Sequence, residues 1–241
     1  MKGVICAGGK GTRLNPITLA INKHMVPILE KPMILYPIST LKALGIKDIM
    51  IVSGGNHVGG FADFLGDGSK YGVNLTYRVQ EGAGGIAQAV GLAEDFAAGG
   101  PIVVILGDNV YDNDSLPIEM LEEVGEEGAQ FYFARVPDPE RFGVPYFNEE
   151  DLSQLIGIEE KPKEPKSKFA VTGLYVYPNN VFEIIKILKP SERGELEITD
   201  VNNWYVERKK CAYHMLQGFW KDCGKRDSLK ETIDWAYKNG R

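Results

Sequence analysis

Short β-rich segments alternate with helix-like segments through the first half of the chain, and this alternation limits the possible folds more than any other feature. The predicted strands are residues 2–7, 48–53, 73–79 and 102–107, and the predicted helices between them are residues 32–45, 56–68 and 84–100. The helix at 32–45 opens with proline and closes on glycine, which are common start and stop signals. Regular strand–helix alternation predicts an α/β fold with a mixed, mostly parallel central sheet flanked by helices.

The second half of the chain has a less regular rhythm and predicts a small additional β region. We expect a helix ending near residue 127, strands at 129–136, 152–160, 169–177 and 211–217, and helices at 178–188, 197–209 and from about 228 to 238. Turn-forming residues at 137–143 separate two of these strands. Because no linker is long enough to separate independent units, we predict a single domain over residues 1–241.

Composition narrows the class of protein. The formal net charge is −6, which argues against a nucleic-acid-binding surface, since such surfaces are normally basic. The longest apolar runs are too short to cross a bilayer, and the N-terminus lacks the extended apolar region of a secretory signal. Three scattered cysteines predict neither a disulfide framework nor a zinc site. We therefore expect a cytoplasmic protein that binds neither membranes nor nucleic acid.

A glycine-rich loop, AGGKGTRLNP at residues 7–16, directly follows the first predicted strand. Glycines let backbone N–H groups approach a phosphate chain closely, and Lys10 and Arg13 add positive charge. The letters match neither the P-loop string nor the dinucleotide fingerprint, whose third glycine position is occupied by Leu14. The loop therefore predicts a phosphate site of another kind.

From this loop onward the chain resembles the sugar nucleotidyltransferase family, whose signature is roughly G-G-x-G-[ST]-R-L followed by P-K-x-x-x-P. The second block is NKHMVP at residues 22–27, with Asn22 where many members have proline or serine. Further matching strings are QEGAGGIAQA at 80–89, LGDNVY at 106–111, DPERFGV at 138–144, EEKPKEPKS at 159–167, VTGLYVYP at 171–178, RGELEITDVN at 193–202 and WKDCGKRDSL at 220–229. Together they cover nearly the whole chain. Within the family they resemble the members that join dTTP to glucose 1-phosphate, releasing pyrophosphate and dTDP-glucose.

The resemblance implies a Rossmann-like nucleotidyltransferase fold, with a nucleotide-binding part at about 1–115 and a sugar-binding part at about 116–241. It also implies a homo-oligomer whose product enters deoxysugar synthesis, commonly toward dTDP-rhamnose and surface polysaccharides. The sequence resembles the short form of the family, without the C-terminal helical extension that helps form a regulatory site in longer members. The sequence therefore leaves open whether feedback inhibition acts in this protein.

Nucleotidyl transfer sets clear chemical requirements. A sugar phosphate is already an anionic nucleophile, so catalysis depends on positioning and charge neutralisation rather than on a general base. Magnesium prefers carboxylate oxygens. Asp108 follows the apolar strand 102–107, where open α/β sheets place ligand groups, and the resemblance supplies Asp222 as the second carboxylate. We expect these two residues to bind Mg²⁺.

The resemblance also implies which cations bind phosphate. Arg13 and Lys23 are expected to hold the triphosphate, with Arg13 stabilising the leaving pyrophosphate. The loop residues expected beside them are Gly8, Gly9, Gly11 and Thr12. Lys161 is expected to bind the phosphate of the sugar and Glu160 its hydroxyl groups, although 159–166 also reads as a plain charged loop.

For the base, Gln80 is the candidate reader, because a side-chain amide can donate and accept, and Gly85 would let the backbone approach. The remaining residues expected at the sugar are Asn109, Gly143, Val171, Thr172 and Trp220. Trp220 reads equally well as a core residue. The three histidines are too dispersed for a metal cluster, so we treat His24 as a loop neighbour of the site and His57 and His214 as structural.

The sequence leaves two alternative functions open. Thymine and uracil differ by one methyl group, which a hydrophobic pocket discriminates only modestly, so a UTP-using or dual-specificity enzyme fits nearly as well. A catalytically silent nucleotide-sugar-binding regulatory protein on the same fold is the second alternative. The presence of all five expected catalytic residues argues against it: Arg13, Lys23, Asp108, Lys161 and Asp222.

Overall fold

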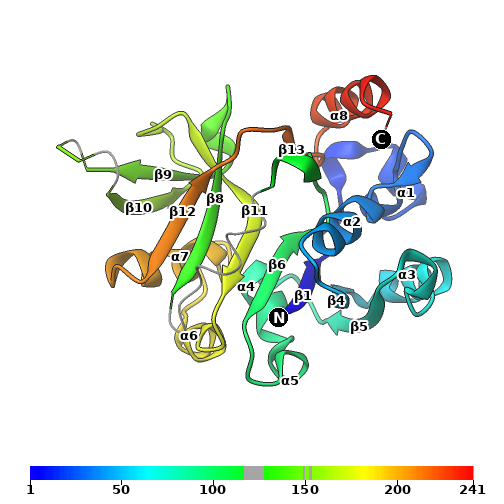
Figure 1. Cartoon of the computed structure of the whole chain (residues 1–241), viewed down its shortest axis with the longest axis horizontal. Helices are drawn as coiled ribbons and strands as arrows, with labels where there is room; N and C mark the ends of the chain where they lie inside the picture. Colours follow the sequence, from blue (N-terminus) through cyan, green and yellow to red (C-terminus); the bar gives the residue numbers. More distant parts are fainter. Residues whose placement is uncertain (117–127, 149, 152–153, 241) are drawn as a thin grey trace.

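A seven-stranded sheet runs through the middle of the computed structural model, which describes residues 1–116, 128–148, 150–151 and 154–240 (Figure 1). Its strands, in spatial order, are β12 (Cys211–Met215), β8 (Ala129–Arg135), β11 (Phe169–Tyr177), β6 (Ile102–Leu106), β1 (Lys2–Cys6), β4 (Asp48–Gly54) and β5 (Asn74–Gln80). All neighbouring pairs are parallel except those of β11, which is antiparallel to β6 and β8. The predicted mixed, mostly parallel sheet is confirmed.

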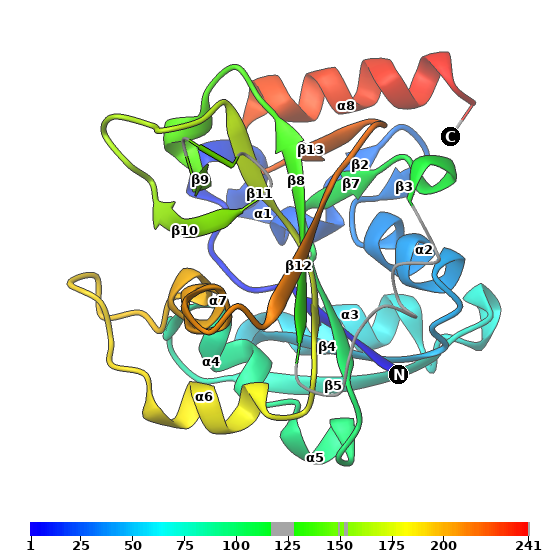
Figure 2. The same cartoon turned by 60° about the vertical axis from the view of Figure 1, so that its left-hand side comes forward.

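Helices cover both faces of this sheet. Side chains alternate along a strand, so Val4 and Ile5 belong to different hydrophobic clusters. The Val4 cluster includes residues of α4 (Gly85–Gly91), α6 (Val181–Ile187) and α7 (Ile198–Glu207), whereas the Ile5 cluster includes residues of α2 (Leu35–Ala43) and α3 (Gly55–Leu65). Figure 2 shows α4, α6 and α7 on the side of the sheet away from α2. The short α5 (Glu94–Ala97) follows α4.

Three two-stranded sheets supplement the central one. They are β7 (Asn109–Tyr111) with β13 (Trp220–Asp222), β9 (Gly143–Phe147) with β10 (Leu155–Glu160), and β2 (Pro27–Ile28) with β3 (Lys31–Pro32). All three pairs are antiparallel. The pair β9–β10 provides the expected additional β region, whereas the pair β7–β13 joins segments that are more than a hundred residues apart.

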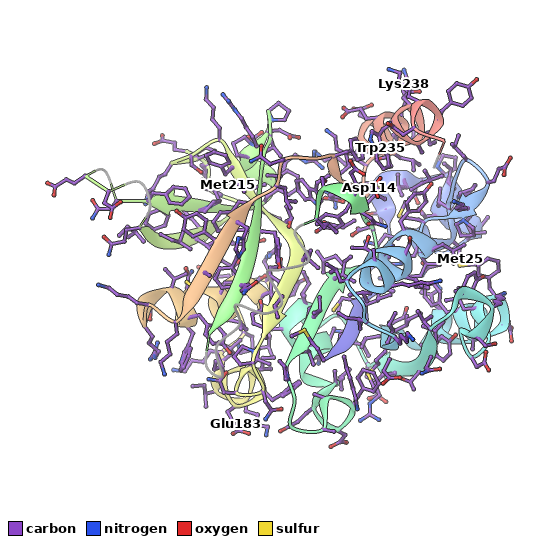
Figure 3. The ribbon with its side chains drawn as sticks, viewed as in Figure 1. Met25, Asp114, Glu183, Met215, Trp235 and Lys238 are labelled. Carbon is purple, nitrogen blue, oxygen red and sulfur yellow. The ribbon has the colours of Figure 1, made fainter. Side chains whose placement is uncertain are left out.

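The last helix, α8 (Arg226–Lys238), packs beside the β7–β13 pair and the N-terminal loops, near the four-residue α1 (Ile17–Ala20) (Figure 2). Trp235 faces the body of the protein and stacks on Phe219 with ring centroids 4.3 Å apart, while Lys238 lies on the exposed side (Figure 3). A third hydrophobic cluster, which includes Leu14, Val110 and Leu229, lies beneath this helix. It ties the start and the end of the chain together.

Several predicted boundaries are wrong. The helix expected at 84–100 is split into α4 and α5, because the chain tightens after Gly91 to a three-residue turn in which Ala93 N–H donates to Val90 O at 2.9 Å. The stretch between the strand expected at 211–217 and the last helix contains β13, which was not predicted, and neither was β9. The helix expected before residue 127 lies outside the described residues, and the strand expected at 152–160 is described only from Leu155.

The part of the chain that the structure describes includes no helix with the length and apolar character needed to span a bilayer.

Candidate active site

A cavity of about 980 Å³ opens at the carboxyl ends of β1, β4, β5 and β6, where open α/β sheets bind ligands. Of the residues predicted for the site, those that line it are Gly8, Gly9, Arg13, Lys23, Gln80, Gly85, Asp108, Asn109, Gly143, Glu160, Lys161, Val171, Trp220 and Asp222. Gly11, Thr12 and Thr172 are absent from the lining. Residues from both halves of the chain therefore meet around one space.

The glycine-rich loop has the predicted tight backbone, but its glycines serve different purposes. Gly9 has φ +92° and lines the cavity. Gly11 has φ +63°, and an added Cβ would lie 2.8 Å from Cβ of Lys23. Thr12 begins the short helix η1 (Thr12–Leu14), whose Leu14 is fully buried. Gly11 therefore allows close packing against Lys23, and direct contact of Gly11 and Thr12 with a nucleotide stays a prediction.

Lys23 and Asp108 form a largely buried ion pair. Lys23 begins the short helix η2 (Lys23–Met25), which Asn22 caps by accepting from His24 N–H at 2.8 Å. The ammonium nitrogen of Lys23 lies 2.6 Å from Oδ2 of Asp108. Burial alone would raise the pKa of Asp108, but the charge and hydrogen bond of Lys23 outweigh it and hold that pKa well below its ordinary value. Asp108 is therefore ionised.

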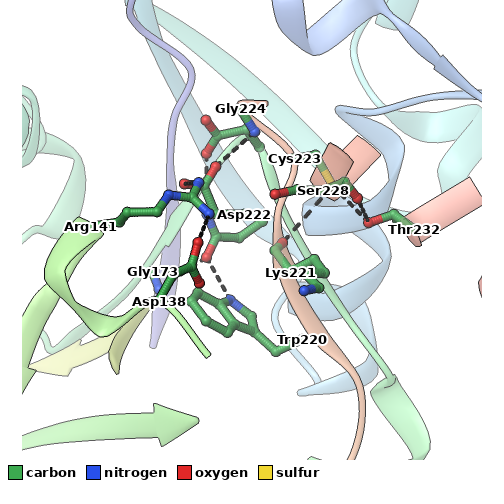
Figure 4. A network of polar contacts seen from close by, with 12 residues as sticks. Asp138, Arg141, Gly173, Trp220, Lys221, Asp222, Cys223, Gly224, Ser228 and Thr232 are labelled. Atoms are coloured by element: carbon green, nitrogen blue, oxygen red, sulfur yellow. Dashed lines mark hydrogen bonds and ion pairs between the residues drawn. The ribbon is translucent and has the colours of Figure 1, made fainter. Parts of the chain in front are cut away.

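Asp222 is brought to Asp108 by strand pairing. In the β7–β13 ladder Asp222 is opposite Asn109, and the next residue, Cys223, donates its N–H to Asp108 O at 2.8 Å. Burial, followed by the charge of Asp108, raises the pKa of Asp222 above its ordinary value. Figure 4 shows Gly224 N–H donating to Oδ1 of Asp222 at 2.7 Å. Two acidic groups thus share one confined space.

A cation would relieve this repulsion. A Cβ placed on Gly224 would lie 2.8 Å from Oδ1 of Asp222, 3.2 Å from Nη2 of Arg13 and 3.5 Å from Oδ2 of Asp108. The two carboxylates and the Arg13 guanidinium therefore converge on one point. The described residues include no group of three potential metal ligands. Two carboxylates suit Mg²⁺, which keeps several waters and commonly takes its other ligands from phosphate oxygens.

Asn109 has a positioning role that was not predicted. Its Oδ1 accepts from Trp220 Nε1 at 2.7 Å and from Gly173 N–H at 3.0 Å, and its Nδ2 donates to Oδ1 of Asp108 at 3.1 Å. Asn109 is buried, so its bonds to β11 and β13 fix its own side chain, which in turn orients Asp108. Direct contact of Asn109 with a sugar stays a prediction. Trp220 is both largely buried and part of the lining.

At the far end of the cavity, Glu160 and Lys161 lie beside a cation that was not predicted. Oε1 of Glu160 lies 2.8 Å from Nζ of Lys161, and Oε2 accepts from Oγ1 of Thr199 at 2.7 Å. Lys161 has φ +46°, an unfavourable conformation for a residue with a Cβ and one that often marks a functional position. Nη2 of Arg193 lies 3.6 Å from Oε1 of Glu160. The same nitrogen donates to both carboxylate oxygens of Glu197, at 2.8 Å each.

Sequence reasoning therefore missed two arginines that line the cavity. Arg193 lies within the matching string 193–202, so position in a family motif was the signal that could have identified it. Arg141 lies within the string 138–144, and its Nη1 pairs with Asp138 at 2.5 Å while Nη2 lies 3.9 Å from Oδ2 of Asp222 (Figure 4). Both arginines add positive charge beside carboxylates.

The other end of the cavity has Gln80, whose Nε2 donates to Gly85 O at 2.9 Å and to Oε1 of Gln88 at 2.8 Å. Gly85 has φ +91°, and an added Cβ would lie 2.4 Å from Leu196 O. The turn that supports Gln80 is thereby packed against the segment that follows Arg193. The turn that positions Gln80 is thus in direct contact with the segment that carries Arg193.

The histidines differ from one another. His24 is fully buried, and burial, reinforced by the Lys23 charge, lowers its pKa to about 3, so it is neutral. His57 was expected to be structural but lines the cavity. His214 lies on β12, outside the lining.

Comparison with known proteins gives consistent results. The family model described as "Nucleotidyl transferase" matches residues 2–237. A glucose-1-phosphate thymidylyltransferase from Neisseria gonorrhoeae is 45% identical over 239 residues, covering 98% of this chain and 82% of the relative. The enzyme of the same name from Mycobacterium tuberculosis is 39% identical over 238 residues, with the same two coverages.

Two solved structures are also similar. A Bacillus anthracis protein in complex with sucrose, assigned as a glucose-1-phosphate thymidylyltransferase, is 51% identical with a TM-score of 0.91, covering 98% of this chain and 95% of that one. A UDP-glucose pyrophosphorylase in complex with UDP-glucose is 25% identical with a TM-score of 0.84, covering 99% and 98%.

Proposed function

Because the chain belongs to the nucleotidyl transferase family, we propose that it transfers a thymidylyl group from dTTP to α-D-glucose 1-phosphate, giving dTDP-glucose and pyrophosphate. One observation carries this proposal: a single cavity joins the glycine-rich loop, two converging carboxylates and the Glu160–Lys161 pair. The relatives with 38–45% identity over almost the whole chain, which are named for this reaction, support the choice of substrates.

In this reaction the phosphate oxygen of the sugar forms a bond to the α-phosphorus of dTTP while the bond to the pyrophosphate oxygen breaks. No proton has to be removed from the nucleophile, so the protein acts by holding the two anions in line and neutralising their charge. Arg13 would stabilise the leaving pyrophosphate through its planar guanidinium. Lys23, which is paired with Asp108, would also lie within reach of the triphosphate and act on it as a point charge.

The convergence of Asp108 and Asp222 suits magnesium, and these two residues would hold it. When bound, Mg²⁺ would neutralise charge on the phosphate oxygens at the reaction centre. The raised pKa of Asp222 supports this assignment, because a divalent cation would relieve the repulsion between the two carboxylates. Asn109 would keep Asp108 correctly oriented through its hydrogen bond.

At the sugar end, Lys161 and Arg193 would bind the phosphate of glucose 1-phosphate, and Glu160 would accept hydrogen bonds from sugar hydroxyls. The left-handed backbone of Lys161 supports a functional role for that position. Gly143, Val171 and Thr172 remain the candidates for contacts around the hexose. At the base end, Gln80 would read the pyrimidine.

Further proposals rest on the family. We propose that residues 1–115 chiefly bind the nucleotide and residues 116–241 chiefly bind the sugar phosphate. We also propose a cytoplasmic homo-oligomer whose product is used in deoxysugar and polysaccharide synthesis, as in dTDP-rhamnose formation.

A UTP-using or dual-specificity enzyme is the second candidate, favoured by the similarity to UDP-glucose pyrophosphorylases. Pyrophosphate release should therefore be measured with glucose 1-phosphate, magnesium and each of dTTP, UTP, CTP, ATP and GTP. Greatest turnover with dTTP supports the proposal, and equal or greater turnover with UTP supports the second candidate. No release from any nucleotide would favour a silent binding protein.

A further inference from the structure

The amide of Gln80 is held in one orientation by a backbone carbonyl and a side-chain amide of α4. Its Nε2 lies 2.9 Å from Gly85 O and 2.8 Å from Oε1 of Gln88. A backbone carbonyl can only accept a hydrogen bond, so the NH₂ end of the amide must face Gly85. Gln88 supplies the second acceptor, so one N–H of Gln80 donates to Gly85 and the other to Gln88.

The other end of the same amide is left for a ligand. A Cβ placed on Gly8 would lie 3.3 Å from Oε1 of Gln80, so this oxygen faces the glycine-rich loop. Gly8 and Gln80 both line the cavity. Gln80 is largely buried, so an alternative orientation could not be satisfied by bulk water. The site therefore presents an acceptor, and no donor from Gln80, to the base.

An acceptor at this place selects among pyrimidines. Thymine and uracil have an N3–H donor at the middle of their pairing edge, whereas cytosine has an unprotonated N3 that only accepts. An Oε1 that faces N3 accepts a hydrogen bond from thymine or uracil but meets the lone pair of N3 on cytosine, and a buried acceptor that faces an acceptor is costly. If the Gln80 amide were flipped, its NH₂ group would face N3 of the base, and the site would favour cytosine over thymine and uracil.

We propose that Gln88 is a specificity-determining positioning residue, which locks the Gln80 amide so that the site accepts imide-type pyrimidines and rejects cytosine. The inference rests on the proposed function, since it refines the nucleotide choice at the same site. Gln88 is absent from the cavity lining, so it acts through Gln80 rather than by touching the base.

Gly84 supplies independent support. A Cβ on Gly84 would lie 2.3 Å from Oε1 and 2.4 Å from Cδ of Gln88. The Gln88 amide thus occupies the space that a side chain at position 84 would need. Gly84→Ala should therefore displace the Gln88 side chain although the residues Gln80 and Gln88 themselves are unchanged. It offers a second way to break the hydrogen bond between these two amides.

The test compares kcat/KM for dTTP and dCTP, with glucose 1-phosphate and magnesium, in wild type, Gln88→Leu, Gln88→Glu and Gly84→Ala. In Gln88→Leu one acceptor for Nε2 is lost, and we expect the dTTP-to-dCTP ratio to fall by roughly tenfold, mainly through KM. Gly84→Ala should lower the ratio in the same direction. A glutamate still accepts from Nε2, so Gln88→Glu should keep the ratio within about threefold of wild type.

A Gln88→Leu or Gly84→Ala protein that is folded by circular dichroism and retains the wild-type ratio would overturn the proposal. Loss of discrimination in Gln88→Glu equal to that in Gln88→Leu would also overturn it, because packing rather than the acceptor would then be responsible. A failure of the proposed function is distinguishable, since wild type itself would then release no pyrophosphate from dTTP.

Discussion

The ammonium nitrogen of Lys23 lies 2.6 Å from Oδ2 of Asp108, in a pair whose side chains are 14% and 12% exposed. Removing one partner of such a pair leaves an uncompensated charge in a largely buried place. We expect Lys23→Met to lower the free energy of unfolding by about 3–5 kcal/mol at pH 7 and to abolish turnover. Chemical denaturation and a pyrophosphate-release assay measure the two effects.

The double variant Lys23→Met/Asp108→Asn separates stability from function. The double variant has no unpaired charge at Asp108, so most of the unfolding free energy lost in Lys23→Met should be regained. Turnover should stay abolished. If the double variant were as unstable as Lys23→Met, packing of the Lys23 stem rather than its charge would account for the loss.

Asp222→Asn should affect activity far more than stability. Its folded-state pKa lies above the ordinary value, so at neutral pH the ionised carboxylate opposes folding, and the neutral amide removes this repulsion while its Oδ1 still accepts from Gly224 N–H. We expect an unfolding free energy equal to or above that of wild type. Turnover should fall by about 10²–10³, with a higher half-saturating magnesium concentration.

The matched control for this variant is Asp227→Asn, an exposed acidic residue in the first turn of α8. Both turnover and magnesium dependence should stay at the wild-type level there. Near-normal turnover of Asp222→Asn at the wild-type magnesium concentration would remove Asp222 from the proposed metal site.

The elements that could be predicted from sequence are those whose signals are local. The apolar segment of β6, with its following Asp108, could be assigned because both lie in one continuous run. The pairing of β7 with β13 could not, since each strand is three residues long and exists only because distant segments meet. That pairing orients Asn109 and joins Asp222 to Asp108, so the assembly of the carboxylates became visible only in three dimensions.

A similar limit applies to the residues that were missed. Apart from its place in a family motif, Arg193 is one charge among many in the sequence, and only the fold places it 3.6 Å from Glu160. Gln88 has the apolar neighbours expected within a helix, and its bond to Gln80 depends on the turn at Gly85. Spacing along the chain cannot encode these contacts.

Gly85→Ala should disturb both the turn that positions Gln80 and the segment that follows Arg193. The residue combines φ +91° with a backbone contact, since an added Cβ would lie 2.4 Å from Leu196 O. We expect a loss of about 2–4 kcal/mol in unfolding free energy and higher KM values for both substrates. Gly82→Ala is the control, because Gly82 also has a left-handed backbone, with φ +72°, but an added Cβ there would have no atom within 4 Å. This variant should lose only about 1 kcal/mol of unfolding free energy. Equal losses of unfolding free energy in the two variants would show that the left-handed backbone, and not the contact with Leu196, is responsible.

Burial of neutral His24 should make the protein less stable in mild acid. Its pKa is lowered from 6.5 to about 3 by burial and then by the charge of Lys23. Between these two values the unfolded chain binds a proton at this residue and the folded protein does not, so stability falls as pH falls. Between pH 7 and pH 5 this one group should lower the unfolding free energy by about 2 kcal/mol.

The measurement is urea denaturation at pH 7 and pH 5 for wild type and His24→Gln. Glutamine can still donate to Oδ1 of Asn22, which lies 2.9 Å from Nδ1 of His24, but it has no proton to gain in this range. The variant is expected to be less stable at pH 7, with a drop between the two pH values that is about 2 kcal/mol smaller than that of wild type. Parallel pH dependence in the two proteins would mean that the pKa of His24 is not lowered in the folded protein, which would contradict the prediction.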